Sequence, residues 1–300
     1  GHELMADNVH FAGLGSMGLG MAQSAIRAGL RVRGFDPDVG QVEKLTAAGG
    51  AALDLAAPKA SALVCVVLNA DQTSAALFGP DGWADTLKPG GVILGCATVA
   101  PDFACAMEAE AEARGLLYLD APISGGAIKA AQGKLSIMAA GRAEAFDRAG
   151  PVMDAMAETV HRLGDRAGNG SAMKAVNQLL AGVHIAAMGE ALSLAASQGL
   201  DLARVLDVIK VSAGTSWMFE NRAPHVIQAD YTPRSTIDIW PKDLGIVTDI
   251  ARTAGLPLPV TETALTEYRA ASAAGLGRQD DAAITRHVAG KAGIKLPGDR

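Results

Sequence analysis

Short apolar runs alternate with helical segments over the first half of the chain, and this alternation restricts the possible folds more than any other feature. Almost continuously apolar runs occur at residues 8–14, 30–35, 62–68, 91–94 and 116–119. Segments of helical periodicity lie between them, for example at residues 17–28 and 101–114. Strands that are apolar on both faces and separated by helices form parallel sheets covered on both sides. The sequence therefore predicts an α/β domain, whose sheet the runs at 135–139 and 160–163 would extend.

The pattern changes after Gly164. Residues 171–198 contain no proline, and their apolar residues recur at intervals of three and four, which predicts one helix of roughly 28 residues, about 42 Å long. Further helical segments follow to the end, broken by glycine and proline. A chain of 300 residues is long enough for two domains. We therefore expect an N-terminal α/β domain over residues 6–167 and an all-helical domain over 168–300 that begins with this long helix.

A glycine-rich turn joins the first predicted strand to the first predicted helix. Its residues are Gly13, Leu14, Gly15, Ser16, Met17 and Gly18. In this context the first glycine permits a tight turn, the second lets a pyrophosphate approach the backbone, and the third lets the helix pack on the strand. Free N–H groups at the start of the helix favour the phosphate. The turn predicts a dinucleotide site, since a purely structural glycine turn explains less of this pattern.

An acidic residue at the end of the second strand indicates which dinucleotide is bound. Asp36 lies 18 residues after Gly18, where a carboxylate can accept both hydroxyls of the adenosine ribose and would repel a 2′-phosphate. Pro37 follows it where an NADP enzyme often has arginine. Arg31 and Arg33 argue the other way, but both precede the carboxylate. We predict that the cofactor is NAD.

Polar side chains share one face at the start of the long helix. Lys174, Asn177 and Gln178 have the spacing i, i+3 and i+4, and Ser171 lies one turn earlier. Their helical neighbours are otherwise apolar. This cluster fits either a functional site or a surface lysine whose stem covers apolar neighbours, and the spacing alone does not decide between them.

Four motifs in order give the chain a resemblance to a known family. They are the glycine turn, Asp120-Ala121-Pro122-Ile123-Ser124-Gly125-Gly126, the Gly168–Lys174 segment, and Lys242-Asp243-Leu244. From about residue 8 to about residue 288 the chain resembles the β-hydroxyacid dehydrogenases, which include 3-hydroxyisobutyrate dehydrogenase and tartronate semialdehyde reductase. The resemblance implies that residues 6–167 form an NAD-binding Rossmann domain and that the long helix is an interdomain helix. It also implies NAD, a small hydroxy acid as substrate, and a homodimer or homotetramer formed through the helical domain.

The same resemblance implies roles for individual residues. Lys174 would be the catalytic acid/base, and oxidation should be faster at alkaline pH because an ordinary lysine is almost fully protonated near neutrality. Ser124, Gly125 and Gly126 would bind the substrate carboxylate, and Asn177 and Gln178 would bind the rest of the substrate. The nicotinamide half of the cofactor would be lined by Leu68, Asn69, Thr73 and Thr98. Lys242 would close over the cofactor. Asp243 would either orient Lys242 or face the substrate. Many family members have Asn four residues after the lysine, whereas this chain has Gln178.

Three further stretches are similar to the L-threonate dehydrogenase branch of this family. They are residues 212–222, which include Trp217, residues 230–233, and residues 275–281. The branch implies oxidation of a four-carbon sugar acid, L-threonate, to 2-oxo-tetronate. Trp217 follows a glycine-containing turn and is either a substrate-binding residue or a core residue of the helical domain. The other functions considered are 3-hydroxyisobutyrate dehydrogenase, tartronate semialdehyde reductase, an imine reductase, and a catalytically silent NAD-binding module.

Composition narrows the partners and the cellular location. The chain has 32 acidic and 26 basic residues and no basic block, which argues against nucleic acid and anionic membranes as partners. No apolar run reaches the roughly 18 residues of a membrane span. Cys65, Cys96 and Cys105 have neither disulfide-framework nor zinc-site spacing, so we expect small buried thiols, no metal and a cytoplasmic protein. Asp280 and Asp281 are expected to cap or precede the last helix.

Overall fold

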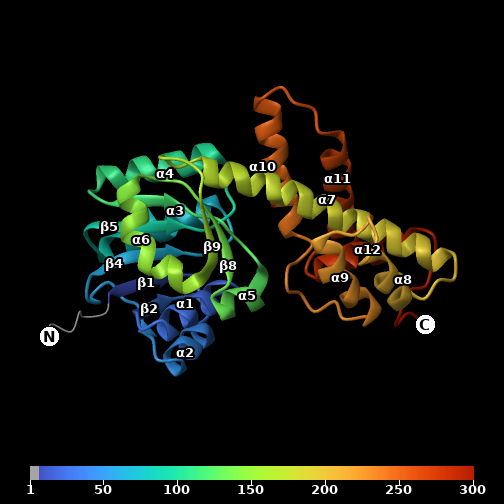
Figure 1. Ribbon diagram of the computed structural model, residues 1–300, viewed down its shortest axis with the longest axis horizontal. Coiled ribbons are helices and arrows are strands. Elements are labelled where there is room, and N and C mark those ends of the chain that lie inside the picture. The colour runs from blue at the N-terminus through green and yellow to red at the C-terminus, as the bar shows by residue number, and fades with distance from the viewer. Residues whose placement is uncertain (1–6) are drawn as a thin grey trace. The chain divides into compact units, whose positions relative to one another are not determined.

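A computed structural model describes residues 7–300 of the protein (Figure 1). The chain divides into two compact units, one up to Lys174 and one from Ala175 onward. The boundary lies inside helix α7, Asn169–Ser197, so this helix starts in the first unit and continues in the second.

The first unit is built on a parallel six-stranded sheet in the order β3-β2-β1-β4-β5-β6. Its strands are β1 Asn8–Ala12, β2 Arg31–Phe35, β3 Ala51–Ala52, β4 Ala60–Cys65, β5 Leu87–Gly95 and β6 Leu117–Asp120. Val9 pairs with Val32 on one side and with Ala62 on the other. The strand order therefore reverses at β1, and ligands of open α/β sheets bind at such a switch point, beyond the carboxyl ends of the strands. The predicted doubly wound sheet is confirmed.

Helices cover both faces of this sheet, as the continuous apolar strands predict. They are α1 Gly18–Arg27, α2 Val39–Ala47, α3 Ala70–Phe78, η1 Trp83–Thr86, α4 Pro101–Ala113, α5 Gly126–Gln132 and α6 Ala143–Met156. One core contains side chains of α1 and α6, such as Met21 and Phe146, packed with Phe11 of β1. The other core contains side chains of α3 and α4, such as Leu77 and Ala104, packed with Leu63 of β4.

The last strands of the first unit form a second sheet, in contrast to the prediction. β7 Ile123–Ser124, β8 Leu135–Ala139 and β9 Ala157–Arg162 make a three-stranded sheet in which β7 and β8 are antiparallel. The expectation that 135–139 and 160–163 extend the main sheet is therefore wrong. After β6 the chain turns through Pro122, and β7 gives β8 a local antiparallel partner. An isolated bridge between Asp120 and Ala140 joins the two regions.

The second unit is helical, as predicted. After α7 come α8 Leu202–Ile209, α9 Trp217–Ile227, α10 Ile239–Thr253, α11 Pro259–Ala271, η2 Ser272–Leu276, η3 Asp281–Ala283 and α12 Ile284–Lys291. Among the described residues from 175 onward there is no strand, and Thr236 and Asp280 form an isolated bridge. Ile185, Met188 and Leu192 of α7 are fully or almost fully buried in this core. The predicted long helix is confirmed, with bounds shifted by one or two residues.

The long helix is also apolar enough to cross a membrane by length and composition. Within α7 an 18-residue window has a mean hydropathy of 1.6, and 39% of that window is buried in the protein. Core helices of globular proteins meet the same criterion, and α7 contributes the centre of a packed core. The cytoplasmic location therefore stays a prediction.

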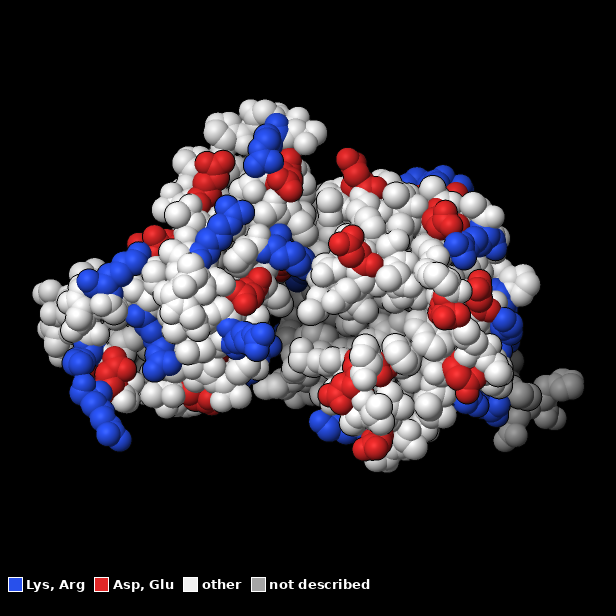
Figure 2. All heavy atoms as spheres, turned by 180° about the vertical axis from the view of Figure 1, so that it is seen from behind, with Lys and Arg blue, Asp and Glu red and all other residues white. Residues whose placement is uncertain are grey.

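The distribution of charged side chains and the burial of the cysteines bear on the expectations from composition. Basic and acidic side chains are interspersed on the face shown in Figure 2. Cys65 and Cys96 are buried, as expected, and burial raises the pKa of the Cys65 thiol to about 12. Cys105 is exposed, so the prediction of a buried thiol is wrong at this position; its Sγ lies 3.2 Å from the carbonyl oxygen of Ala167.

A buried histidine in β1 should make the fold sensitive to acid. His10 is fully buried, its Nδ1 lies 2.8 Å from Thr86 Oγ1, and burial followed by the charge of Arg33 lowers its pKa from 6.5 to about 4. Between these values the unfolded chain binds a proton that the folded chain does not, so stability falls as the pH falls. At pH 4.5 the loss relative to pH 7 should be about 2 kcal/mol for this group.

Urea unfolding at pH 7 and 4.5 tests this with the variant His10→Leu. The variant lacks the Thr86 contact at both pH values, but it should lose less stability on acidification than the original protein does. Equal acid-dependent losses in the two proteins would contradict the assignment to His10.

Candidate functional site

The glycine turn after β1 has the geometry that its motif predicts. Gly13 has φ 101°, and a Cβ there would lie 2.0 Å from the carbonyl oxygen of Val66. A Cβ on Gly18 would lie 2.3 Å from the carbonyl oxygen of Gly13. At Gly15, by contrast, a Cβ would meet no atom within 4 Å. The outer glycines are therefore required by packing, whereas the middle one leaves open space where a pyrophosphate can approach the backbone.

Asp36 lies directly after β2 and braces this turn. Its Oδ2 accepts a hydrogen bond from the backbone N–H of Leu14 at 2.8 Å, and its Oδ1 accepts one from Asp38 at 2.9 Å. Each oxygen keeps a second lone pair for a ligand hydroxyl. The carboxylate is thus fixed beside the glycine turn, in the position where the motif expects a ribose-binding acid.

The residues predicted to line the nicotinamide half follow β4 and β5, which are neighbours in the sheet. Asn69 caps α3 by accepting from the N–H of Gln72 at 2.8 Å, and the buried Thr73 hydroxyl donates to the Asn69 carbonyl at 2.8 Å. Leu68 is 62% exposed, and Thr98 is half-buried after β5. Gln72 was not predicted; its side chain accepts from the N–H of Leu68 at 2.9 Å and so holds this loop.

Two buried carboxylates hold the start of α7, and sequence reasoning assigned a role to neither. Asp120, 1% exposed at the end of β6, accepts from the N–H of Gly168 at 3.0 Å and from the N–H and hydroxyl of Ser171 at 2.8 and 2.7 Å. Burial raises the pKa of Asp120, and the bonds from Ser171 and Gly168 oppose that rise. Glu108 accepts from the N–H of Ala167 at 2.9 Å. The first turn of α7 is therefore anchored to the sheet.

Lys174 is buried, with 7% of the residue exposed, and its Nζ donates to the carbonyl of Ile123 at 2.8 Å. The alternative of a surface lysine is therefore wrong. The next residues, Ser124, Gly125 and Gly126, form a turn in which the glycines have φ of 138° and 81°. Residues that carry a side chain rarely adopt these values. An amine thus lies beside a turn whose following helix, α5, begins with N–H groups that lack intrahelical partners.

A second polar group lies in the helical unit, on α7 and α10. Gln178 Nε2 donates to Asp243 Oδ2 at 2.7 Å, and its Oε1 accepts from Asn177 Nδ2 at 3.0 Å. Lys242 Nζ lies 2.9 Å from Asp243 Oδ1 in an ion pair. Asn177, Gln178, Lys242 and Asp243 were all predicted, and the fold brings them together. Asp243 therefore contacts Lys242, and its role toward the substrate stays a prediction.

Trp217 is separate from this group. It is the first residue of α9, after Ser216, whose hydroxyl caps the helix by accepting from the N–H of Phe219 at 3.0 Å. Trp217 is 54% exposed. The alternative of a core tryptophan is therefore wrong.

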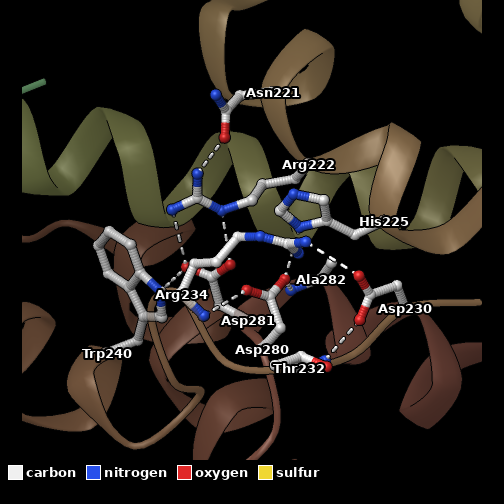
Figure 3. Close-up of polar contacts among 10 residues, drawn as sticks. All are labelled: Asn221, Arg222, His225, Asp230, Thr232, Arg234, Trp240, Asp280, Asp281 and Ala282. Atoms are coloured by element: carbon white, nitrogen blue, oxygen red, sulfur yellow. Dashed lines mark hydrogen bonds and ion pairs between the residues drawn. The ribbon is translucent and has the colours of Figure 1, made fainter. Parts of the chain in front are cut away.

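The three stretches that are similar to the L-threonate dehydrogenase branch meet in one polar network (Figure 3). Arg222 of α9 pairs with Asp281 at 2.7 Å, His225 Nδ1 lies 2.8 Å from Asp280 Oδ2, and Trp240 Nε1 donates to Asp281 at 3.0 Å. Asp280 and Asp281 are fully buried. Asp280 also accepts from the N–H of Ala282 and so caps η3. The predicted capping role therefore holds for Asp280, but both carboxylates also join α9 and α10 to the end of the chain.

The pKa values of these two carboxylates shift in opposite directions, although burial acts upward on both. Burial raises the pKa of Asp281, and the nearby Arg222 only partly opposes this. For Asp280 burial also acts upward, but the hydrogen bonds from His225 and from the backbone outweigh it and hold the pKa below its usual value. No group of three or more potential metal ligands occurs within residues 7–300.

Known proteins are similar to the chain over nearly its whole length. Residues 8–164 match the model described as the NAD binding domain of 6-phosphogluconate dehydrogenase, and residues 168–288 match NAD-binding of NADP-dependent 3-hydroxyisobutyrate dehydrogenase. An L-threonate dehydrogenase from Cupriavidus necator is 46% identical over 98% of this chain and 99% of the relative. One from Pectobacterium atrosepticum is 46% identical over 95% and 94%. The crystal structure of a 3-hydroxyisobutyrate dehydrogenase from Salmonella typhimurium has 47% identity and a TM-score of 0.90, covering 94% of this chain and 99% of that one.

Fold, glycine turn and comparisons define an NAD-dependent oxidoreductase that acts on the CH–OH group of a small hydroxy acid. The chain belongs to the 3-hydroxyisobutyrate dehydrogenase-like family of β-hydroxyacid dehydrogenases.

Proposed function

We propose that the protein oxidises L-threonate at the hydroxyl beside the carboxylate and forms 2-oxo-tetronate, with Lys174 as the acid/base. The observation that carries the acid/base role is the buried Lys174 amine, which is hydrogen-bonded next to the Ser124–Gly126 turn. The choice of substrate is supported by the L-threonate dehydrogenases among the relatives, at 46% identity.

Each part of the proposed site has a chemical task. The glycine turn would hold the pyrophosphate of NAD, Asp36 the adenosine ribose, and Leu68, Asn69, Thr73 and Thr98 the nicotinamide half. Bound NAD supplies the hydride acceptor. Lys174 takes the proton of the substrate hydroxyl, and the Ser124 hydroxyl with the N–H groups of Gly125 and Gly126 binds the carboxylate. Asn177 offers an amide to the remaining hydroxyls, and Trp217 contributes an exposed aromatic surface.

Initial rates with a panel of hydroxy acids test the substrate. L-threonate, erythronate, 3-hydroxyisobutyrate, glycerate and serine are each offered with NAD and NADP, and L-threonate is expected to give the highest kcat/KM. A higher kcat/KM for another acid of the panel would overturn L-threonate as the substrate, while the proposed reaction type would stand. If no acid of the panel is turned over while NAD still binds, the protein is a silent NAD-binding module.

A second candidate substrate is 3-hydroxyisobutyrate. The related crystal structure of that name has 47% identity to this chain, which is as close as the L-threonate dehydrogenases. The two acids differ in the number of hydroxyls beyond the reacting one, so the same panel separates them.

The carboxylate of Asp36 should set the preference for NAD over NADP. In the protein as it is, kcat/KM is expected to be at least about 100-fold higher with NAD, because a 2′-phosphate would meet the fixed carboxylate. Asp36→Ala should lower that ratio by about 10-fold or more through loss of the ribose contact and of the repulsion. Asp38→Ala, which removes the neighbouring exposed carboxylate, is the control. Equal use of both cofactors by the unchanged protein would contradict the role of Asp36.

The oligomer predicted through the helical domain is part of the same proposal. Val176, Leu180 and Leu194 lie along one side of α7 and are 56%, 49% and 66% exposed. Apolar residues repeated at helical spacing on an exposed face favour contact with a second copy of the chain. Light scattering should give a dimer or tetramer, and Leu180→Glu combined with Leu194→Glu should lower that mass; a monomeric original protein would overturn this part.

A further inference from the structure

The amide group of Gln178 is the feature in which this chain departs from the pattern of its family. The side chain is one methylene longer than the Asn that many members carry at this position. It is 9% exposed, so it lies largely inside the helical unit.

Both ends of the Gln178 amide are already engaged within the protein. The nitrogen donates to the Asp243 carboxylate at 2.7 Å, and the oxygen accepts from Asn177 at 3.0 Å. The 2.7 Å contact is short, as expected for a bond to a charged acceptor. Its partner, Asp243, is 3% exposed, so this hydrogen bond replaces water that the carboxylate lost on burial.

The second oxygen of Asp243 has a different environment. It lies 2.9 Å from Lys242 Nζ in an ion pair, and among the described residues it has no hydrogen-bond partner. The two oxygens are therefore distinguished: Oδ2 is fixed by a neutral amide, and Oδ1 faces a charged amine. Without the amide, the carboxylate could rotate and turn either oxygen to Lys242.

We infer that Gln178 is a positioning residue, which fixes the rotation of the Asp243 carboxylate and thereby the place of the Lys242 ammonium, and that it does not bind the substrate. The inference rests on the proposed function for its effect on turnover. It corrects the role that the resemblance implies for Gln178. The consequence is that loss of the amide should impair every hydroxy-acid substrate by the same factor, whatever its length.

A double-mutant cycle with an isosteric variant tests the inference. Gln178→Met keeps the length of the side chain and removes both hydrogen bonds, Asp243→Ala removes the carboxylate with both of its acceptor oxygens, and the third protein carries both changes. Gln198→Met, at an exposed position just after α7, is the matched control. The measurements are kcat and KM with L-threonate and with 3-hydroxyisobutyrate, and the urea-unfolding free energy of each protein.

Gln178→Met is expected to lower kcat/KM by about 10- to 100-fold, the range for a hydrogen bond to a charged group. The factor should be the same for both acids within about threefold, and the double variant should be no worse than Asp243→Ala alone. A loss confined to the acid with more hydroxyls would make Gln178 a substrate ligand and overturn the inference. Additive losses would overturn it as well, because they remove the coupling to Asp243.

The unfolding measurements separate the inference from the proposed function. Coupling between residues 178 and 243 in the unfolding free energy is expected even if the protein turns over neither acid. In that case the proposed substrate is wrong, and the inference about Gln178 still holds. Absence of this coupling overturns the inference whatever the activity. Gln178→Glu gives a second readout: it places a carboxylate against Asp243 and should cost more activity than Gln178→Met. Equal activity of these two variants would show that the contact between residues 178 and 243 contributes only packing, and this would overturn the inference.

Discussion

Lys174→Met should lower kcat for oxidation of the best hydroxy acid by about 10²- to 10⁴-fold, the usual contribution of a general acid/base. Methionine fills a similar volume in the buried site but accepts no proton. The Kd for NAD should change by less than about twofold, since an interaction made only in the transition state affects kcat and not ground-state binding. Stopped-flow kinetics and fluorescence titration with the cofactor give the two numbers.

An exposed lysine provides the control for this result. Lys88→Met, on β5, should leave both kcat and the Kd for NAD unchanged, because the side chain is exposed and outside the proposed site. If Lys174→Met weakened NAD binding as strongly as it lowered kcat, Lys174 would be a structural residue. If it left kcat unchanged, the proposed chemistry would be wrong.

Asp120→Ala should have the largest effect on stability, a loss of about 3–5 kcal/mol in the free energy of unfolding. The variant leaves the N–H groups of Gly168 and Ser171 and the Ser171 hydroxyl without their shared acceptor. Ser171→Ala removes one of these bonds and should cost only about 1 kcal/mol. Urea unfolding at pH 7 measures both.

The same variants connect stability with turnover. Asp120 and Ile123 hold α7 at its start and at Lys174, so loosening the first contact should lower kcat in the variant that still folds. Asp120→Asn keeps one acceptor oxygen and should fall between Ser171→Ala and Asp120→Ala in both measurements. A stable Asp120→Ala protein with undiminished kcat would show that the anchor does not position the lysine.

Local patterns predicted most of the fold because each strand or helix is encoded by nearby residues. The apolar run 135–139 was correctly predicted to be a strand, but it was assigned to the wrong sheet. A run of apolar residues specifies burial and conformation, whereas the strand beside which it lies depends on the preceding turn, here at Pro122.

Long-range polar contacts account for what the sequence did not predict at the site. The glycine turn was predictable because its steric requirements are local. Asp120 and Glu108 bind backbone groups 48 to 59 residues further along the chain, and no spacing rule indicates such pairs. Likewise the stretches around Arg222 and Asp281 were individually noted, but only folding brings the two side chains together.

Because Lys174 and Gln178 belong to one uninterrupted helix, their angular phase is set by backbone alone. Each residue of an α-helix turns the direction of its side chain by about 100°. Inserting or removing a single residue between them would turn the Gln178 amide to another direction around the helix axis, even if the amide itself were unchanged. Evolution of this enzyme can exchange side chains along that short interval far more easily than it can alter its length.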